Sequence, residues 1–204
     1  MTDTPLRDRI LDTAHRLVLE RGFSATSLND VLTEAGASKG AFFHHFAGKS
    51  GLGHALVERY AEADAALLDE FMGRAEQATD DPAEQLVAFV RGLEEAADGA
   101  DTSQPGCLFV SFVYEQVPET AATRELIADA VRLWRERILA KLEHPSVVDR
   151  LPAGLDRASL ADQVFTTFEG AFILARATDD SSHVRAQLAH LRRYFALLLD
   201  VPAA

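Results

Sequence analysis

Residues 39–45 carry side chains suited to contacting a polyanion. Lys39 can neutralise a phosphate or reach the edge of a guanine, and His44 and His45 can donate hydrogen bonds to phosphates or base edges. Gly40 and Ala41 lack bulk, which lets a backbone come close to its target. Residue types in this order indicate contact with nucleic acid.

The same histidines are candidate ligands for a metal ion, together with His54 or His15. Adjacent residues of a helix point about 100° apart, so His44 and His45 do not readily share one ion. We therefore expect no metal site, and no motif indicates another cofactor.

Cys107 offers a different chemistry. It follows Pro105 and Gly106 at the start of an expected helix, where the helix dipole lowers the pKa of a thiol and favours a reactive thiolate. Unpaired cysteine is also among the most buried residue types. A packed side chain and a reactive thiol both remain open, and we favour the packed one.

Composition and charge narrow the class of partner. The chain has 204 residues, 48% of them hydrophobic, and a net charge of −12, which argues against a polyanion bound along the whole chain. Residues 1–50 carry six basic and six acidic side chains, so the acidic excess lies in residues 51–204. We expect only the first fifty residues to approach DNA.

Location follows from what the sequence lacks. No signal-type start and no run of about 18 apolar residues is present, so we expect a cytoplasmic protein with no membrane partner. The single cysteine cannot form an internal disulfide, which also suits a reducing compartment.

Three short helices position residues 39–45. An apolar stripe runs through residues 5–21, Ser27 begins a second stripe that ends at Gly36, and Ser38 can cap a third helix over 39–46. The second and third helices are joined only by residues 35–38, the short turn of a helix-turn-helix, whose second helix enters the major groove.

The remaining chain also shows helical periodicity. We expect helices from Ser50 to about residue 73, from Pro82 onward, through Cys107 to 113, over 119–142, 158–178 and 182–199, and a loop over 144–156. No segment alternates with period two. The fold class is therefore all-α, with a helix-turn-helix head at residues 1–48 and a ligand-binding and dimerisation domain at residues 49–204.

Segments 22–31, 35–46 and 49–52 resemble the N-terminal signature of the tetracycline-repressor (TetR) family in residue type and spacing. They read Gly-Phe-Ser-Ala-Thr-Ser-Leu-Asn-Asp-Val, Ala-Gly-Ala-Ser-Lys-Gly-Ala-Phe-Phe-His-His-Phe and Lys-Ser-Gly-Leu, and the resemblance covers about residues 6–55. It implies a nine-helix homodimer that binds a palindromic operator in double-stranded DNA. It also implies repression that ends when a small molecule binds the body.

By position, the resemblance carries the family's DNA contacts to Thr26, Ser38, Lys39, Gly40, Ala41, Phe43, His44, His45 and Lys49. Ser27 joins this set because helix N-termini at 26–27 and 49–50 present amide donors to phosphates. Phe43 departs from the family, which usually has tyrosine there. A phenyl ring cannot donate to a phosphate, so this contact is lost or becomes apolar packing on a sugar or a thymine methyl.

The last two helices predict a four-helix dimer interface, because apolar residues recur at alternating spacings of four and three. The interface residues are Val164, Phe168, Ala171, Ala175, Val184, Leu188, Leu191, Phe195 and Leu198. A pocket for an unknown, apolar or aromatic effector follows from the resemblance, and its candidate lining residues are Phe89, Cys107, Phe112, Trp134 and Phe168.

Four functions compete at this point: a DNA-binding dimer that lacks any effector, and three others. The first of these three is a ligand-responsive repressor. The second is a repressor that senses electrophiles or oxidants through Cys107, since the Gly-Cys-Leu helix start is similar to that of TetR-type regulators with this response. The third is an enzyme with an accessory DNA-binding head, against which stands the lack of a phosphate-cradling loop, a metal cluster or a nucleophile-base motif.

Overall fold

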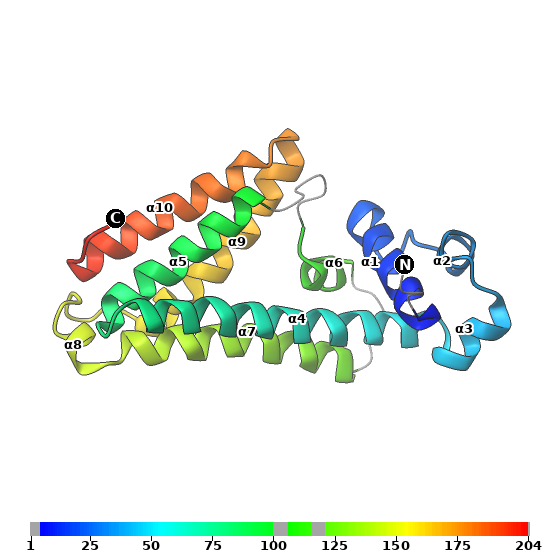
Figure 1. The fold of residues 1–204 in the computed structure, drawn as a ribbon, viewed down its shortest axis with the longest axis horizontal. Coiled ribbons are helices and arrows are strands. Elements are labelled where there is room, and N and C mark those ends of the chain that lie inside the picture. Colours follow the sequence, from blue (N-terminus) through cyan, green and yellow to red (C-terminus); the bar gives the residue numbers. More distant parts are fainter. Residues whose placement is uncertain (1–4, 100–105, 116–120, 204) are drawn as a thin grey trace. The chain divides into compact units, whose positions relative to one another are not determined.

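The computed structural model describes residues 5–99, 106–115 and 121–203, and within these ranges it contains ten helices and no strand (Figure 1). The all-α fold class is confirmed. The helices are α1 (Leu6–Arg21), α2 (Leu28–Ala35), α3 (Lys39–His45), α4 (Gly48–Ala78), α5 (Pro82–Gly99), α6 (Leu108–Tyr114), α7 (Ala121–Leu142), α8 (Pro145–Val148), α9 (Arg157–Thr178) and α10 (Ser182–Leu199).

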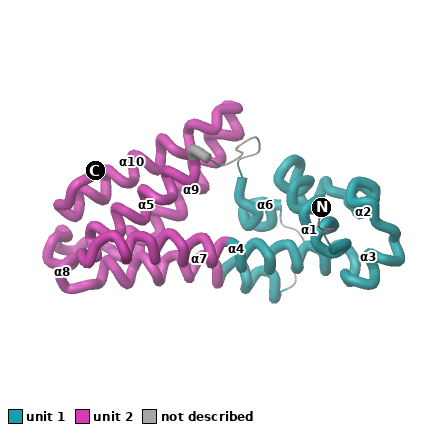
Figure 2. Tube along the Cα trace, in the orientation of Figure 1, with its two compact units in different colours: residues 1–63, 106–128 teal, residues 64–105, 129–204 magenta. Residues whose placement is uncertain are grey.

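The chain divides into two compact units (Figure 2). Unit 1 comprises residues 1–63 and 106–128, and unit 2 comprises residues 64–105 and 129–204. The three N-terminal helices therefore share a unit with the beginning of α4, with α6 and with the beginning of α7.

The predicted helix ends of the head are confirmed. Ser27 caps α2, Gly36 ends it in the left-handed conformation with φ 63°, and the Ser38 hydroxyl accepts the Ala41 amide at the start of α3. Gly22 ends α1 with φ 88°, a value that glycine adopts without a steric penalty. Local side-chain chemistry thus sets where each short helix begins and ends.

A small apolar core holds the head together. The buried side chains come from the predicted stripes: Ile10, Leu11, Ala14, Leu17, Val18, Val31, Leu32, Ala35, Phe42 and Phe46. Phe42 has no exposed surface, and its ring packs against Phe46 one turn later with centroids 5.2 Å apart. Burial of an aromatic side chain contributes roughly 1.5–3 kcal/mol, so Phe42 anchors α3 on the head.

Unit 2 is built around α5, which packs against α10, while α10 in turn packs against α9. The end of α4 and part of α7 run in the same direction and are joined by Arg137–Asp69 and Lys141–Glu76 ion pairs. Leu68, Phe71, Met72 and Ala75 of α4 enter the same core as α5, α9 and α10.

The side chains predicted to form the dimer interface lie instead in the core of a single chain. Seven of them are buried there: Val164, Ala171, Ala175, Val184, Leu188, Leu191 and Phe195. Phe168 and Leu198 are partly buried and pack against the same core. The buried members of this set have little surface to offer a second chain, and whether the set takes part in a dimer interface stays a prediction. Four-and-three spacing marks any buried helical face, including one covered within the subunit.

Several helix bounds differ from the predictions. Helix α4 begins at Gly48, not at Ser50, and continues past Gly73 to Ala78, because burial of Phe71, Met72 and Ala75 outweighs the roughly 1 kcal/mol that an interior glycine costs. The segment 144–156, predicted as a loop, contains the one-turn helix α8, which Pro145 begins. Pro105 and Glu119, where two helices were expected to open, lie outside the described residues.

No helix in the described part of the chain is long and apolar enough to cross a membrane.

Candidate nucleic-acid interface

Helix α3 presents most of its predicted contact residues on one exposed surface. Lys39, Gly40, Phe43, His44 and His45 are exposed and Ala41 is partly exposed, whereas Phe42 faces the core. An α-helix with its side chains is about 10–12 Å across, which fits the roughly 12 Å width of the major groove of B-DNA. The face therefore has the size and side chains of a recognition helix.

Phe43 is unusual on this face because an apolar ring is 60% exposed. Its ring stands edge-on to Phe42, with centroids 5.3 Å apart and an interplanar angle of 85°. The phenyl group offers no donor to a phosphate. Its exposed surface can instead pack on a thymine methyl or a sugar.

His44 and His45 pack edge to face, with ring centroids 5.1 Å apart. Among the described residues no group of three or more His, Cys, Asp or Glu side chains is arranged to hold a metal ion. The two exposed imidazoles are thus available as hydrogen-bond donors or acceptors toward base edges and phosphates.

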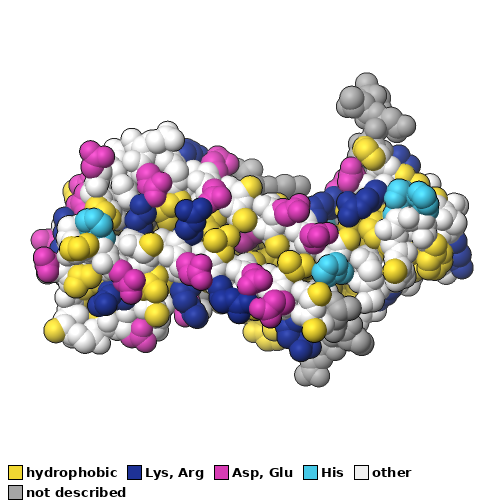
Figure 3. Space-filling model, turned by 90° about the horizontal axis from the view of Figure 1, so that it is seen from below, with side chains coloured by type: hydrophobic (Ala, Val, Ile, Leu, Met, Phe, Trp, Pro, Cys, Tyr) yellow, Lys and Arg dark blue, Asp and Glu magenta, His cyan; other side chains and the backbone are white. Residues whose placement is uncertain are grey.

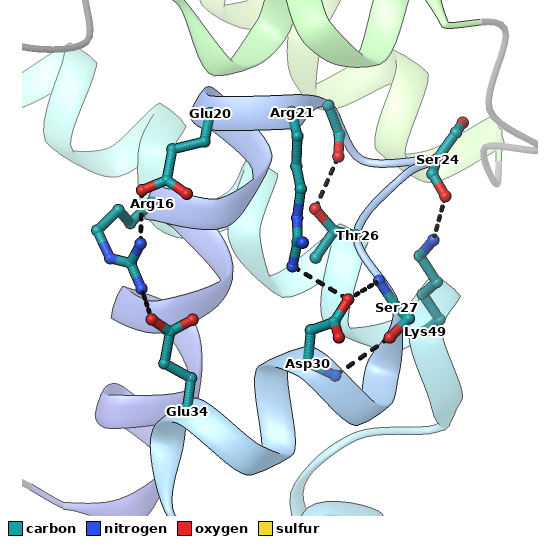
Figure 4. Close-up of polar contacts among 10 residues, drawn as sticks. Arg16, Glu20, Arg21, Ser24, Thr26, Ser27, Asp30, Glu34 and Lys49 are labelled. Carbon is teal, nitrogen blue, oxygen red and sulfur yellow. Dashed lines mark hydrogen bonds and ion pairs between the residues drawn. The ribbon is translucent and has the colours of Figure 1, made fainter.

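The N-terminus of α2 is closed by a capping box (Figure 4). The Asp30 amide donates to the Ser27 hydroxyl at 3.1 Å, and the Ser27 amide donates to the Asp30 carboxylate at 3.2 Å. Hydrogen bonding from Ser27 lowers the pKa of Asp30, and the nearby Arg21 guanidinium, 3.0 Å away, adds to this effect. The box uses donors that would otherwise face a phosphate, so Ser27 acts first as a helix cap.

Thr26 is held inside the head. The residue is only 3% exposed, and its hydroxyl donates to the Gly22 carbonyl at 2.7 Å (Figure 4). This hydrogen bond stabilises the turn after α1, and a contact between Thr26 and a phosphate stays a prediction. Ser38, by contrast, is exposed beside the start of α3.

Two arginines of the head, Arg16 and Arg21, are paired with acidic side chains. Arg16 contacts both Glu20 and Glu34, and hydrogen bonding to Glu20 raises the pKa of the Arg16 guanidinium (Figure 4). Arg59 pairs with Asp12 at 2.7 Å. On the face drawn in Figure 3, Asp and Glu side chains lie among Lys and Arg side chains. Contact with DNA therefore depends on a few individual side chains, not on a large positive electrostatic potential over the head.

Lys49 is directed into the head. Its ammonium donates to the Ser24 carbonyl at 3.2 Å and lies 4.8 Å from the centre of the Phe23 ring. Burial lowers the pKa of Lys49, and the negative charge of Glu115 acts in the opposite direction. This ammonium braces the turn after α1, and a phosphate contact would be made from that position.

Sequence reasoning missed Glu115. Its carboxylate accepts the Phe23 amide at 2.8 Å and the Ser24 amide at 2.5 Å. The partners are more than ninety positions apart in the chain, and neither helical periodicity nor a capping motif relates residues at that separation. Only the packing of α6 against α1 brings them together.

The candidate effector residues fall into two groups. Phe89, Trp134 and Phe168 belong to unit 2 and form a row of rings, with centroid distances of 5.9 Å between the first two and 6.4 Å between the last two. Cys107 and Phe112 belong to unit 1. There, Phe112 packs against Phe23 at 4.7 Å, and Cys107 is 7% exposed as the residue preceding α6.

A capped helix-turn-helix with an exposed second helix defines a DNA-binding protein. Residues 10–56 match the family model described as bacterial regulatory proteins of the tetR family. Residues 82–191 match the model described as the tetracyclin repressor-like C-terminal domain. The chain belongs to the TetR family of transcriptional regulators, as its N-terminal motif indicated.

Individual relatives agree with this assignment. The chain is 23% identical to the HTH-type transcriptional repressor DhaR of Mycobacterium sp. (strain GP1), over 85% of this chain and 83% of DhaR. It is 30% identical to an uncharacterized HTH-type transcriptional regulator of Mycobacterium tuberculosis, over 96% of each chain. The crystal structure of reduced Escherichia coli NemR covers 98% of this chain and 99% of NemR with a TM-score of 0.74 and 22% identity, and thus shares the fold.

Proposed function

We propose that this regulator binds a palindromic operator as a homodimer, represses transcription, and leaves the operator when a small molecule binds its body. Residues 1–48 serve as the DNA-binding domain, and residues 49–204 serve in ligand binding and dimerisation. The exposed face of α3 is the observation that carries the DNA-binding part of the proposal.

The operator can be found by selection. The full chain, mixed at low salt with duplexes of random sequence, should enrich a two-fold symmetric motif whose half-sites lie one helical turn or more apart. The matched control is a triple variant of α3, Lys39→Ala with His44→Ala and His45→Ala, which leaves Phe42 and the Ser38 cap in place. The variant should lose the enrichment. Enrichment of an identical motif by both proteins would mean that α3 does not read the sequence.

Dimerisation is supported by an exposed apolar surface on the two last helices. Ile173 and Leu174 of α9 and Tyr194 and Leu197 of α10 are all exposed, and Leu197 is 84% exposed. A surface groove lies between the same helices, lined by Gln163, Thr167, Gln187, His190, Leu191 and Tyr194. This outward face replaces the buried seam as the proposed interface, and a partner chain would cover it.

Analytical sedimentation tests the interface. Leu197→Glu combined with Ile173→Glu should convert a dimer into a monomer at micromolar concentration, because two desolvated charges per chain would face the partner. Leu67→Glu is the matched control, since Leu67 is an exposed leucine on α4 outside this face. A monomeric wild-type chain, or a dimer that survives the double substitution, would contradict the proposed interface.

The effector site is proposed at the row of rings in unit 2, where an apolar or aromatic molecule would meet Phe89, Trp134 and Phe168. Trp134 is the only tryptophan of the chain, so its fluorescence reports on this site alone. A compound that releases the operator should also change the Trp134 emission with the same concentration dependence. Release without any change in emission would place the effector elsewhere.

A further inference from the structure

We infer that Glu115 is a positioning residue for operator binding. Its carboxylate holds the turn between α1 and α2 in the conformation that presents helix α3 to DNA. The inference rests on the DNA-binding part of the proposed function. The contacts of Glu115 with Phe23 and Ser24 lie within unit 1. One carboxylate oxygen accepts the Phe23 amide at 2.8 Å, and the other accepts the Ser24 amide at 2.5 Å.

The turn is built to receive this carboxylate. Phe23 and Ser24 lie beyond the last residue of α1, and their two successive amides donate to the same carboxylate, so they form a concave site for an anion. A β-carbon at Gly22 would overlap the Glu115 carboxyl group, so only glycine permits the approach. The φ of 88° at Gly22 adds an independent requirement for the same residue.

A second side chain of α6 reinforces the contact. Phe112 lies three residues before Glu115, on the same face of the helix, and its ring packs on Phe23 with centroids 4.7 Å apart. Gly53 of α4 leaves room for this pair, since a β-carbon there would lie 2.8 Å from the Phe23 ring and 3.2 Å from the Phe112 ring. The end of α6 thus contacts the turn after α1 in two ways, through the hydrogen bonds of Glu115 and through the packing of Phe112 on Phe23.

The turn at Phe23 and Ser24 is close in the sequence to the proposed DNA contacts. Ser24 is three residues from Ser27, which caps α2, and the Ser24 carbonyl accepts the Lys49 ammonium at the start of α4. Loss of the Glu115 carboxylate would leave the Phe23 and Ser24 amides without their acceptor, in the same turn whose Ser24 carbonyl binds Lys49. Helix α3 and the start of α4 would then sample other positions, and a site that is 1 Å out of place binds its target less well.

Hydrogen exchange of the full chain without DNA tests the contact itself. Phe23 and Ser24 amides should exchange at least about tenfold faster in Glu115→Ala, because Glu115 supplies their hydrogen-bond acceptors, while the Phe42 amide inside the head should keep its rate. Glu62→Ala, an exposed glutamate of the same unit, is the control with the same charge change. Unchanged exchange at Phe23 and Ser24 would overturn the inference.

Operator affinity tests the positioning role. Glu115→Ala should bind the duplex selected by the wild-type chain at least about tenfold more weakly, the loss expected for roughly one hydrogen bond to a charged group, whereas Glu62→Ala should stay within about twofold. Faster exchange with unchanged affinity would reduce Glu115 to a stabilising contact and also overturn the inference. If the wild-type chain selects no duplex, the proposed function fails, while the exchange result still decides whether the contact exists.

A double-mutant cycle separates a specific contact from general loss of fold. Gly22→Ala should weaken operator binding in the wild-type background and weaken it less in the Glu115→Ala background, because the overlap with the carboxyl group is then absent. If Glu115→Ala does not fold, Glu115→Gln replaces it in the exchange experiment. The amide keeps the size of the side chain and one acceptor, but its NH2 group faces the second backbone donor. Fully additive effects would contradict a direct contact.

Discussion

Replacing Lys39 with alanine gives a prediction whose size follows from the charges of the head. Lys39 is exposed at the first position of α3, whereas Arg16 and Arg21 are already paired with Glu20, Glu34 and Asp30. Few unpaired cations then remain to displace counterions from DNA. The loss of one phosphate contact per head should make the slope of log K against log[salt] less steep by about 0.9, or about 1.8 for a dimer with two heads.

The same slope change predicts the loss of affinity. At about 0.15 M salt a difference of about 1.8 in slope corresponds to roughly thirtyfold weaker binding, and the loss shrinks as salt rises. Fluorescence anisotropy of the selected duplex, titrated at several salt concentrations, measures both quantities. Arg74→Ala on α4 in unit 2 is the control, because Arg74 is exposed and its substitution removes the same charge. A wild-type slope in Lys39→Ala would show that Lys39 meets no phosphate and that the reading of α3 is mistaken.

Three further outcomes are expected. In denaturant titration, Ser27→Ala should lower the free energy of unfolding by about 1 kcal/mol, because the Asp30 amide then loses its acceptor at the cap. Ser27→Asp supplies an acceptor again and should restore most of this stability. An equal loss in both variants would contradict the capping role. Trp134 donates to the Asp64 carboxylate at 2.7 Å, but burial outweighs this hydrogen bond and raises the pKa of Asp64. The folded state therefore disfavours the charged carboxylate, and the free energy of unfolding falls as the pH rises above the ordinary aspartate range. Asp64→Asn should therefore unfold at higher denaturant concentration than wild type at neutral pH, with the difference vanishing in acid, and a gain that persists in acid would refute this cause. Buried Cys107 should react with iodoacetamide far more slowly in the native chain than in the unfolded chain, as mass spectrometry can follow; rapid native labelling would instead support a thiol sensor.

Features that depend on neighbours along one helix could be predicted from the sequence. The Ser27 cap, the left-handed Gly36 and the outward face of α3 involve residues within a few positions of one another, and helical geometry determines their relation. For the same reason Phe42 was correctly placed in the core beneath its exposed neighbours.

Features that depend on long-range packing could not be predicted from the sequence. The spacing of Val184, Leu188 and Leu191 shows that one face of α10 is buried, but it does not say whether a second chain or α5 and α9 of the same chain cover that face. Thr26 looks like a surface residue until the Gly22 carbonyl is seen to accept its hydroxyl. The contact of Glu115 with the turn after α1 requires the docking of α6, which no local pattern encodes.

The central claim is that α3 lies in the major groove of its operator. Methylation of guanine N7 with dimethyl sulfate marks that groove directly, since N7 faces the major groove while adenine N3 faces the minor groove. We expect methylated N7 positions within both half-sites of the selected duplex to prevent binding of the full chain, and the bound chain to protect the same positions from the reagent. Binding that tolerates N7 methylation throughout the site, or that is blocked only by methylation at adenine N3, would contradict the claim.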